Sequence, residues 1–512
     1  MLRVRQERGQ RVQIGAVFLL ATLLWGAPGG AADAPSLWLP VTAVVHVHSN
    51  LSTGADSLDT LAARARAAGV DAVFLTDNLL LRYEYGLYPL RGLIRRTVAL
   101  PSVMDMGIDR YLTQVREAGA RHPDVLLIPG VEVAPHYYWT GSPFTKDLTM
   151  HDSQKNLLVL GLPSSQDYKR LPVAGNQAAY VYGWMTPVWL APLLLAVPAI
   201  WLLRHPTYKR ALSGGTIKTV CIRRTGVVAA LLGLAAALLF YNYPFASPRY
   251  DAYQDGSGLR PYQDLIEYVQ ERGGLTFWSM PDARDFNRYD YGRLGVVTVK
   301  TDPYPEALLL TTGYTGFGSL HQDHLTAIDP GETWDAALQA YLDGTRAQVP
   351  WGVGEVAYHQ DGSAGIFLHA VETVLWVRER TVPALLEAMA KGRMYALVRT
   401  KAYGLVLNDF SLMASFSGER AISGETVNAS PSGDLQIRIA VTASDGQAHP
   451  VQVQIIRSGR VLATRTGQTP FVVEYRDSAP SAGRRVYYRL LIGSPGNRIV
   501  SNPIFVTTPS VP

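Results

Sequence analysis

The chain of 512 residues contains a single cysteine, Cys221. One cysteine can form neither a disulfide within the chain nor a metal cluster held by several thiolates, so both are excluded. The rest of the sequence is free of cysteine, which is compatible with an oxidising compartment.

Charge is also sparse, since charged residues make up 17% of the chain and the formal net charge is +5. The basic residues form no stripe interleaved with aromatics, so we expect no nucleic-acid partner. The mean hydropathy of +0.04 is high for a soluble enzyme, which indicates that apolar residues are concentrated in a few segments. A chain of this length is expected to form at least two domains.

The first apolar segment lies within residues 1–34. Arginines precede an uninterrupted apolar run from Ile14 to Trp25, and Ala32 and Ala34 offer an A-x-A-like cleavage point. This layout is typical of a signal peptide, although an uncleaved N-terminal anchor has the same pattern. Both alternatives stay open.

Two further apolar segments, residues 182–203 and 226–243, carry no charge and are long enough to cross a bilayer. We predict that each is a transmembrane helix; the alternative is a buried core hairpin. The loop between them, residues 204–225, is rich in Lys and Arg and has no acidic residue, which predicts that it stays in the cytoplasm. The basic N-terminus is then also expected inside, and residues from about 35 to 181 and from about 244 onward are expected on the periplasmic or extracellular side of the cell membrane.

The segments 35–181 and 244–401 alternate between apolar strands and helices. The expected strands cover residues 42–49, 71–78, 124–133, 156–162, 274–281, 306–313 and 349–359. A helix is expected after the first strand, with Ser57 as its N-cap and Gly69 as its end. Near-continuous apolar strands separated by helices favour parallel strands covered by helices, and chemistry is expected at their carboxyl ends.

Two histidines end the first strand, in the sequence `HVHS`. Side chains alternate along a strand, so His46 and His48 are expected to point the same way and to be able to share one metal ion. Such a pair is not specific by itself. Other polar residues follow the later strands, namely Asp77, Asn78, Glu132 and His359.

The motifs `HVHS`, `AAGVDAVFLTDN` and `LLIPGVEV`, in this order, resemble the PHP superfamily, the polymerase and histidinol phosphatase phosphoesterases. Within it the chain is most similar to exported members related to carbaryl hydrolase. The resemblance covers about residues 40–180 and 245–400. It implies a distorted seven-stranded, TIM-like α/β barrel, here interrupted by a membrane hairpin. It also implies divalent ions, often zinc, manganese or iron, that activate water against phosphoesters and related bonds.

Carried over by position, the resemblance assigns His46, His48 and Glu132 as metal ligands. Other ligand positions of the family are changed in this chain, where Asn78, Asn156 and Met280 stand for histidine and Ala357 stands for aspartate. The resemblance therefore implies a reduced site that holds one ion.

Some residues outside the matched ligands are further candidates. We predict Glu355 as a substitute ligand, and we predict catalytic roles for Asp77 and His359. For Asp77, hydrogen bonding to the loop after its strand is an open alternative. His151 and the cluster His321–His324 fit ordinary surface positions better than ligand positions.

Residues 402–512 show alternating strands separated by Gly, Ser, Asp and Pro, which predicts a small all-β sandwich. We expect a structural role for it, with a carbohydrate-binding accessory role as the alternative.

These features lead to two hypotheses. The first is a membrane-anchored, exported hydrolase that acts on a small molecule or an envelope polymer. The second is a catalytically degraded barrel that acts as a binding or scaffold protein at the cell envelope.

Overall fold

The computed structural model describes most of the chain from Trp38 onward, and this part forms one compact unit. The described residues are 38–88, 91, 94–183, 186–213, 215–222, 224–243, 245–292, 295–321, 325–415, 417–431 and 433–509. The predicted signal or anchor at 1–34 and residues 322–324 of the His321–His324 cluster lie outside the described residues.

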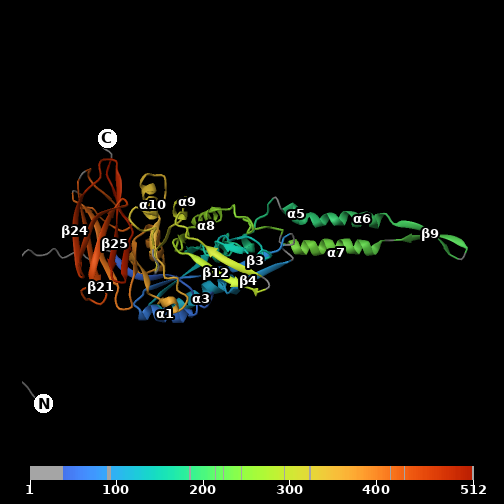
Figure 1. Cartoon of the computed structure of the whole chain (residues 1–512), viewed down its shortest axis with the longest axis horizontal. Coiled ribbons are helices and arrows are strands. Elements are labelled where there is room, and N and C mark those ends of the chain that lie inside the picture. The colour runs from blue at the N-terminus through green and yellow to red at the C-terminus, as the bar shows by residue number, and fades with distance from the viewer. Residues whose placement is uncertain are drawn as a thin grey trace, which may run out of the picture. The chain divides into compact units, whose positions relative to one another are not determined.

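The largest sheet begins with strands that alternate with helices along the chain (Figure 1). These strands are β1 (Leu39–Val47), β2 (Ala72–Asn78), β5 (Leu126–Val133), β8 (Leu157–Leu160), β11 (Leu275–Trp278), β14 (Gly316–Leu320) and β15 (Trp351–Gly354). They lie in the order β15-β14-β11-β8-β5-β2-β1. Neighbours are parallel except around β8, which runs antiparallel to β5 and β11.

The two ends of this strand order are joined through the backbone. After β15, the N–H of Val356 donates to the carbonyl of Val45 at 3.0 Å, and the N–H of Tyr358 donates to that of His46 at 2.9 Å. The N–H of His48 in turn donates to the carbonyl of Tyr358 at 2.8 Å. The chain that follows β15 therefore lies beside β1.

One of the predicted strands is wrong. Residues expected as a strand at 306–313 contain the short helix α9 (Ala307–Leu310), and the next strand is β14 instead. A short apolar run fits a strand and a buried helical turn equally well. Here the run forms a helical turn, and the side chains of Ala307 and Leu308 on this helix are buried.

Helices cover the strands and contribute apolar faces to the core. The longer ones are α1 (Leu58–Ala67), α3 (Ile108–Arg121), α8 (Arg260–Gln270), α10 (Thr333–Leu342) and α11 (Val382–Lys391); α2 (Val103–Met106) and α4 (Ser165–Lys169) are short. The predicted helix start is confirmed, because the Ser57 hydroxyl accepts a hydrogen bond from the Thr60 N–H at 3.2 Å. Gly69 follows α1 with φ of 72°, as a helix end requires.

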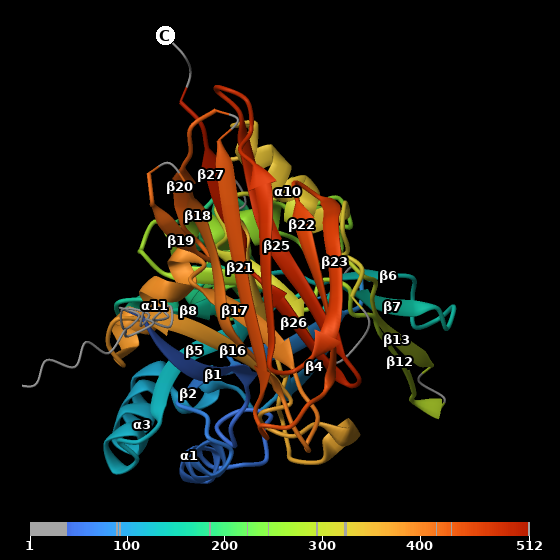
Figure 2. The ribbon, with the colours of Figure 1, turned by 90° about the vertical axis from the view of Figure 1, so that its left-hand side faces the viewer.

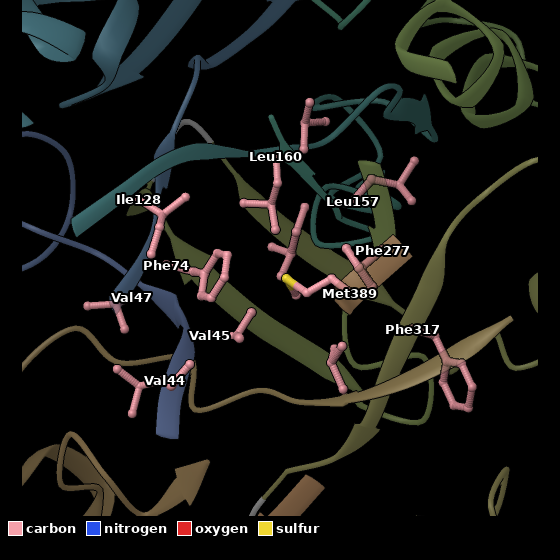
Figure 3. Packing of buried hydrophobic residues seen from close by; sticks show 14 of the residues in the cluster. Val44, Val45, Val47, Phe74, Ile128, Leu157, Leu160, Phe277, Phe317 and Met389 are labelled. Atoms are coloured by element: carbon pink, nitrogen blue, oxygen red, sulfur yellow. The ribbon is translucent and has the colours of Figure 1, made fainter. Parts of the chain in front are cut away.

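The core lies between strands and helices and is built from the apolar runs that marked the strands. Figure 3 shows Val45, Phe74, Ile128 and Phe277 packed together, and all of them are buried. All residues of β2 are buried. Burial on both faces explains why the strand sequences are continuously apolar rather than alternating.

Two additional β structures flank the strand ends. A ribbon pairs β3 (Leu81–Gly86) with β4 (Arg95–Leu100), antiparallel. A four-stranded sheet has the order β12-β13-β7-β6, formed by Asp285–Asp290, Val296–Thr301, Leu148–His151 and Tyr138–Thr140 respectively. Neither had been predicted from the sequence.

Two apolar helices lie side by side beyond the β3/β4 ribbon and the four-stranded sheet (Figure 1). The first apolar span, Thr186–Arg204, comprises α5 (Thr186–Leu190), a 3₁₀ turn (Ala191–Leu195) and α6 (Ala196–Arg204). The second is α7 (Thr225–Asn242), and the spans are only 6% and 11% buried. This exposure does not fit the alternative of a buried core hairpin, whereas membrane insertion itself stays a prediction. The basic loop between them forms a ribbon of β9 (Thr207–Ser213) and β10 (Thr216–Ile222).

The C-terminal strands form two facing sheets (Figure 2). One continues the large sheet through β16 (Val371–Val377), β17 (Met394–Val398), β26 (Asn497–Ser501), β25 (Arg485–Ser494), β22 (Pro450–Arg457) and β23 (Arg460–Gln468). The other contains β19 (Arg420–Ile422), β18 (Leu405–Ala414), β21 (Asp434–Ala443) and β24 (Phe471–Ser478). Two short strands, β20 (Thr426–Asn428) and β27 (Ile504–Thr507), pair with each other, and β27 also pairs with β25. A second apolar cluster, including Leu412, Ile437 and Ile455, fills the space between the two sheets.

Residue 402, where the sequence predicts the start of the C-terminal domain, is preceded and followed by strands of the same large sheet. Strand β17 pairs with β26, so the large sheet crosses that boundary. The Arg489 guanidinium on β25 donates two 2.7 Å hydrogen bonds to Asp335 on α10, and both residues are buried. These contacts attach the C-terminal strands to the helices that cover the first part of the sheet.

Candidate metal centre

The two histidines of `HVHS` are positioned by an irregular end of β1. The pairing register between β1 and β2 shifts between Val45 and Val47, and His46 has φ of 71°. Positive φ is uncommon in a non-glycine residue, and such irregularities re-aim side chains near functional sites. The rings of His46 and His48 lie 5.2 Å apart. The predicted proximity is observed, but it arises from this irregularity rather than from regular alternation alone.

Glu132, near the end of β5, joins the pair. Its Oε1 lies 3.2 Å from Nε2 of His46, and its Oε2 lies 3.5 Å from Nε2 of His48. One ligand atom from each residue lies within 4.8 Å of the others, and all three residues are buried. The fold therefore brings together the three ligands that the motifs indicated, and this group can hold a divalent metal ion.

The donor set fits such an ion. Both ring nitrogens of His48 are buried and make no hydrogen bond among the described residues. A buried polar atom without a partner is costly, so these nitrogens indicate a ligand that completes the site. Two imidazoles and one carboxylate form a donor set typical of zinc and related transition metals.

Glu355 lies behind His46 rather than beside Glu132. Its Oε2 is 3.1 Å from Nδ1 of His46, and it accepts a 2.8 Å hydrogen bond from the Ser279 hydroxyl. A carboxylate on the far nitrogen of a ligand histidine fixes the orientation of the ring. The predicted role of Glu355 as a ligand stays a prediction, and its placement favours orientation of His46.

Two asparagine amides hold the carboxylate of Glu132. Nδ2 of Asn78 donates to Oε2 at 2.6 Å, and Nδ2 of Asn156 donates to Oε1 at 2.7 Å. The Thr53 hydroxyl donates to Oδ1 of Asn78 at 2.7 Å, which fixes the orientation of that amide. At these two positions, where the resemblance implies histidine ligands, the asparagines present N–H groups to Glu132.

The charges of this cluster are strongly coupled. Burial alone would lower the pKa of His46, but the carboxylates of Glu132 and Glu355 outweigh it and raise the pKa to about 10. Burial would raise the pKa of Glu132, yet His46 and His48 lower it to about 2. For His48, burial dominates and lowers the pKa well below its ordinary value, so the ring is neutral and one of its nitrogens is available as a ligand.

His359 stacks on the ring of His48, with ring centroids 4.1 Å apart. Its Nδ1–H donates to the carbonyl of Ala357 at 3.2 Å, which leaves Nε2 as a proton acceptor. Burial lowers its pKa, so the ring is neutral near pH 7. This geometry is compatible with the predicted catalytic role of His359, which stays a prediction.

Asp77 is fully buried beneath the loop that follows β1. It accepts hydrogen bonds from the backbone N–H of Ser49 at 2.8 Å and from the Ser52 hydroxyl at 2.6 Å. The Ser49 hydroxyl also donates to both of its oxygens. Asp77 therefore holds the loop after β1, which carries the histidine pair, rather than the loop after its own strand. Its catalytic role stays a prediction.

The remaining candidates lie in varied surroundings. Met280, with φ of 40°, lines the cavity beside the triad. His151 on β7 contacts the Thr140 hydroxyl at 2.8 Å and stacks on Tyr138 within the four-stranded sheet. His321 is buried directly after β14. None of these three belongs to the ligand group found among the described residues.

A cavity of about 850 Å³ opens beside the triad. His46, Glu132 and His359 contribute to its wall, as do both the β3/β4 ribbon and the β12/β13 strands. Sequence reasoning missed these wall residues. The alternating aromatics of `RYEY` in β3 are the one local signal, since a regular strand would place Tyr83 and Tyr85 on one face.

No family model matches the chain, and no curated protein matches it. Solved structures are similar to it. A two-domain protein of Bacteroides vulgatus, described as containing a predicted PHP-like metal-dependent phosphoesterase, is 12% identical, with 89% of this chain and 91% of that chain covered and a TM-score of 0.33. An amidohydrolase from Chromobacterium violaceum with bound sulfate and no metal is 15% identical, with 64% and 90% covered and a TM-score of 0.27.

At this level of similarity the activities of those proteins do not transfer to this chain.

Proposed function

We propose that this chain is a hydrolase of phosphoesters or related bonds that uses one divalent ion held by His46, His48 and Glu132. The observation that carries the proposal is the buried Nε2 of His48, which has no hydrogen-bond partner among the residues that the structure describes and lies 3.5 Å from Oε2 of Glu132. A metal ion in this position would satisfy that nitrogen and the carboxylate together.

The surrounding residues have separate roles in this proposal. The ion supplies a Lewis acid and an activated water when it is bound. Glu355 orients His46 through Nδ1, and the amides of Asn78 and Asn156 fix the carboxylate of Glu132. His359 holds or moves a proton at Nε2, on the wall of the cavity where a substrate would lie.

We infer that the first seven strands of the large sheet form a distorted barrel of the PHP type, in the branch related to carbaryl hydrolase. The backbone hydrogen bonds between residues 356–358 and β1 support closure. In a barrel, the strand ends that carry His46, Glu132 and Glu355 belong at one rim.

The proposed enzyme is anchored by the two apolar helices, with the catalytic part and the C-terminal strands exported. Exposure of the spans Thr186–Arg204 and Thr225–Asn242 supports this arrangement, as does the basic ribbon between them. Cys221, which is exposed on β10, allows a direct test. A membrane-impermeant maleimide should label it only after the cells are lysed; labelling of intact cells would contradict the cytoplasmic loop.

The second candidate function is a binding or scaffold protein on a degraded barrel. It is favoured by the two asparagine amides on Glu132, because each carboxylate oxygen already accepts a hydrogen bond without any ion. A small molecule or an envelope polymer would then be bound rather than cleaved.

Metal analysis separates the two candidates. The purified full chain, incubated with Zn²⁺, Mn²⁺ or Fe²⁺ and then desalted, should retain about one equivalent of metal, as three protein ligands imply. It should also hydrolyse bis(p-nitrophenyl) phosphate. The His46→Ala, His48→Ala variant should lose both properties, whereas the surface control His122→Ala should keep both. Failure of the parent chain to retain any metal would overturn the enzyme proposal and favour the binding protein.

A further inference from the structure

The cavity beside the metal centre is larger and more apolar than a small phosphoester requires. Its volume of about 850 Å³ lies near the upper end of ordinary ligand sites. Its far wall is formed by side chains of two strand pairs, which are called the two ribbons below. The β3/β4 ribbon contributes Tyr83, Val98 and Leu100, and the β12/β13 pair contributes Tyr289, Val297 and Val299.

These wall residues are not core residues of the fold. Val98 is 41% exposed and Tyr289 is 49% exposed, although both lie on short strands next to the cavity. Contiguous apolar surface of this kind is uncommon on soluble proteins and marks a binding site. An apolar ligand between the two ribbons would cover it.

The cavity wall includes three arginines, Arg95, Arg96 and Arg284, together with the carboxylates of Glu132 and Asp285. Arg95 pairs with Glu84, and Arg284 pairs with Asp302. The guanidinium of Arg96 lies 5.1 Å above the ring of Tyr291, so the β3/β4 ribbon contacts the turn between β12 and β13 across the cavity. Arginines beside an apolar wall complement a ligand that has an anionic group and an apolar chain.

The β3/β4 ribbon stands at the base of the two apolar helices. The N–H of Gly86 donates a hydrogen bond to the Tyr253 hydroxyl oxygen at 2.7 Å, and the guanidinium of Arg91 lies 3.7 Å from the centre of the Tyr253 ring. Tyr253 follows the second apolar helix, and Val181, just before the first, pairs with Ser247. The cavity wall is thus attached to the segments that lead into both apolar spans.

We propose that the substrate is an amphiphilic phosphoester of lipid type. The phosphoryl group would lie at His46, His48 and Glu132, and its apolar chain would lie between the ribbons. This rests on the proposed function and specifies its substrate class. Hydrolysis adds the oxygen of water to phosphorus, breaks one P–O ester bond and transfers a proton of that water to the departing alkoxide oxygen.

A matched pair of substrates tests the chain preference. Methyl p-nitrophenyl phosphate and dodecyl p-nitrophenyl phosphate have the same reacting group and differ only in the alkyl chain. The full chain is kept in amphipol, and each ester is used below its critical micelle concentration. We expect kcat/KM to be about 100-fold higher for the dodecyl ester, because each CH₂ group that is buried in the cavity adds favourable binding free energy. A ratio near one, with both esters hydrolysed, would overturn the lipid-type substrate and leave the proposed hydrolase intact.

A substitution in the cavity wall tests whether the cavity causes the preference for the dodecyl ester. Val98→Asp should reduce the dodecyl-to-methyl ratio of kcat/KM by about tenfold or more, because it places a charge against the alkyl chain. Val472→Asp, on an exposed strand of the C-terminal region, is the control and should change neither rate. An unchanged ratio in Val98→Asp would also contradict the proposal.

Binding gives a readout that does not depend on catalysis. Calorimetry should detect dodecyl phosphate binding to the full chain, with methyl phosphate binding at least about tenfold more weakly. If the chain binds dodecyl phosphate but hydrolyses neither ester, the proposed hydrolase fails while the lipid-type ligand stands. Equal or absent binding of the two phosphates would overturn the lipid-type ligand.

Discussion

The side-chain amide of Asn156 donates a 2.7 Å hydrogen bond to Oε1 of Glu132, the same oxygen that lies 3.2 Å from Nε2 of His46. Asn78 makes the equivalent contact to Oε2. Both oxygens of the carboxylate are therefore occupied by N–H donors at the positions where the PHP resemblance implies histidine ligands. This arrangement supports the proposal of one ion shared by His46, His48 and Glu132.

Replacing both asparagines with histidine should restore a second metal position. In the Asn78→His, Asn156→His variant, imidazole nitrogens would replace N–H groups, and Glu132 would be free to bridge two ions. We expect the metal content, measured by atomic emission after desalting, to rise from about one to about two equivalents. Asn408→His, at an exposed position on β18, is the control. A content that stays at one equivalent would show that the amides do not set the stoichiometry.

Glu355 should act on metal affinity through His46. In Glu355→Gln the 3.1 Å contact to Nδ1 loses its charge, so the ring is held less firmly. We expect the dissociation constant of the ion, measured by competition with a chelating dye, to rise by about 10- to 100-fold. The exposed control Glu379→Gln should leave it unchanged. Complete loss of the ion would instead indicate direct ligation by Glu355.

Stability should depend on pH through Glu372 on β16. Burial raises the pKa of this carboxyl to about 7, although Arg399 opposes the shift from 3.1 Å. Between the ordinary pKa of 4.5 and about 7, the folded chain keeps a proton that the unfolded chain has lost. Its contribution to stability is therefore present below the lower value and decreases by up to about 3 kcal/mol as the pH rises.

The Glu372→Gln variant isolates this contribution. Its free energy of unfolding, measured by denaturant titration of intrinsic fluorescence between pH 4.5 and 8, should lack the decrease seen in the parent chain. Other titrating groups cancel in the difference between the two proteins. Parallel pH profiles would contradict the raised pKa.

The buried pair of Arg489 and Asp335 should be essential for attachment of the C-terminal strands. Asp335→Ala leaves the guanidinium buried without its carboxylate, so we expect a loss of about 3 to 5 kcal/mol in the free energy of unfolding. Arg420→Ala, which breaks an exposed pair with Asp409, should cost less than about 1 kcal/mol. Equal losses in the two variants would contradict a special role for the buried pair.

Local sequence determined the elements whose signals are local. Ser57 and Gly69 marked the limits of α1, and uninterrupted apolar runs marked strands such as β2. The same reasoning failed at 306–313, because a short apolar run fits both a strand and a buried helical turn, and α9 is the latter.

The pairing of distant segments was decided only by the tertiary structure. Strand alternation predicts which side chains share a face, but it does not say which strand lies next to which. The contact of Glu355 with His46 joins residues 309 positions apart, and β17 pairs with β26 across the expected boundary at 402. The ribbons that form the apolar cavity wall were likewise absent from the sequence prediction.

For the site itself, the sequence determined the donor types: two histidines, one glutamate and two amides near the strand ends. The tertiary structure decided how they are used. Thr53 turns the amide of Asn78 toward Glu132, and Glu355 turns the ring of His46. Because an amide or an imidazole can present either of its polar atoms, only its neighbours in space determine which atom faces the metal site.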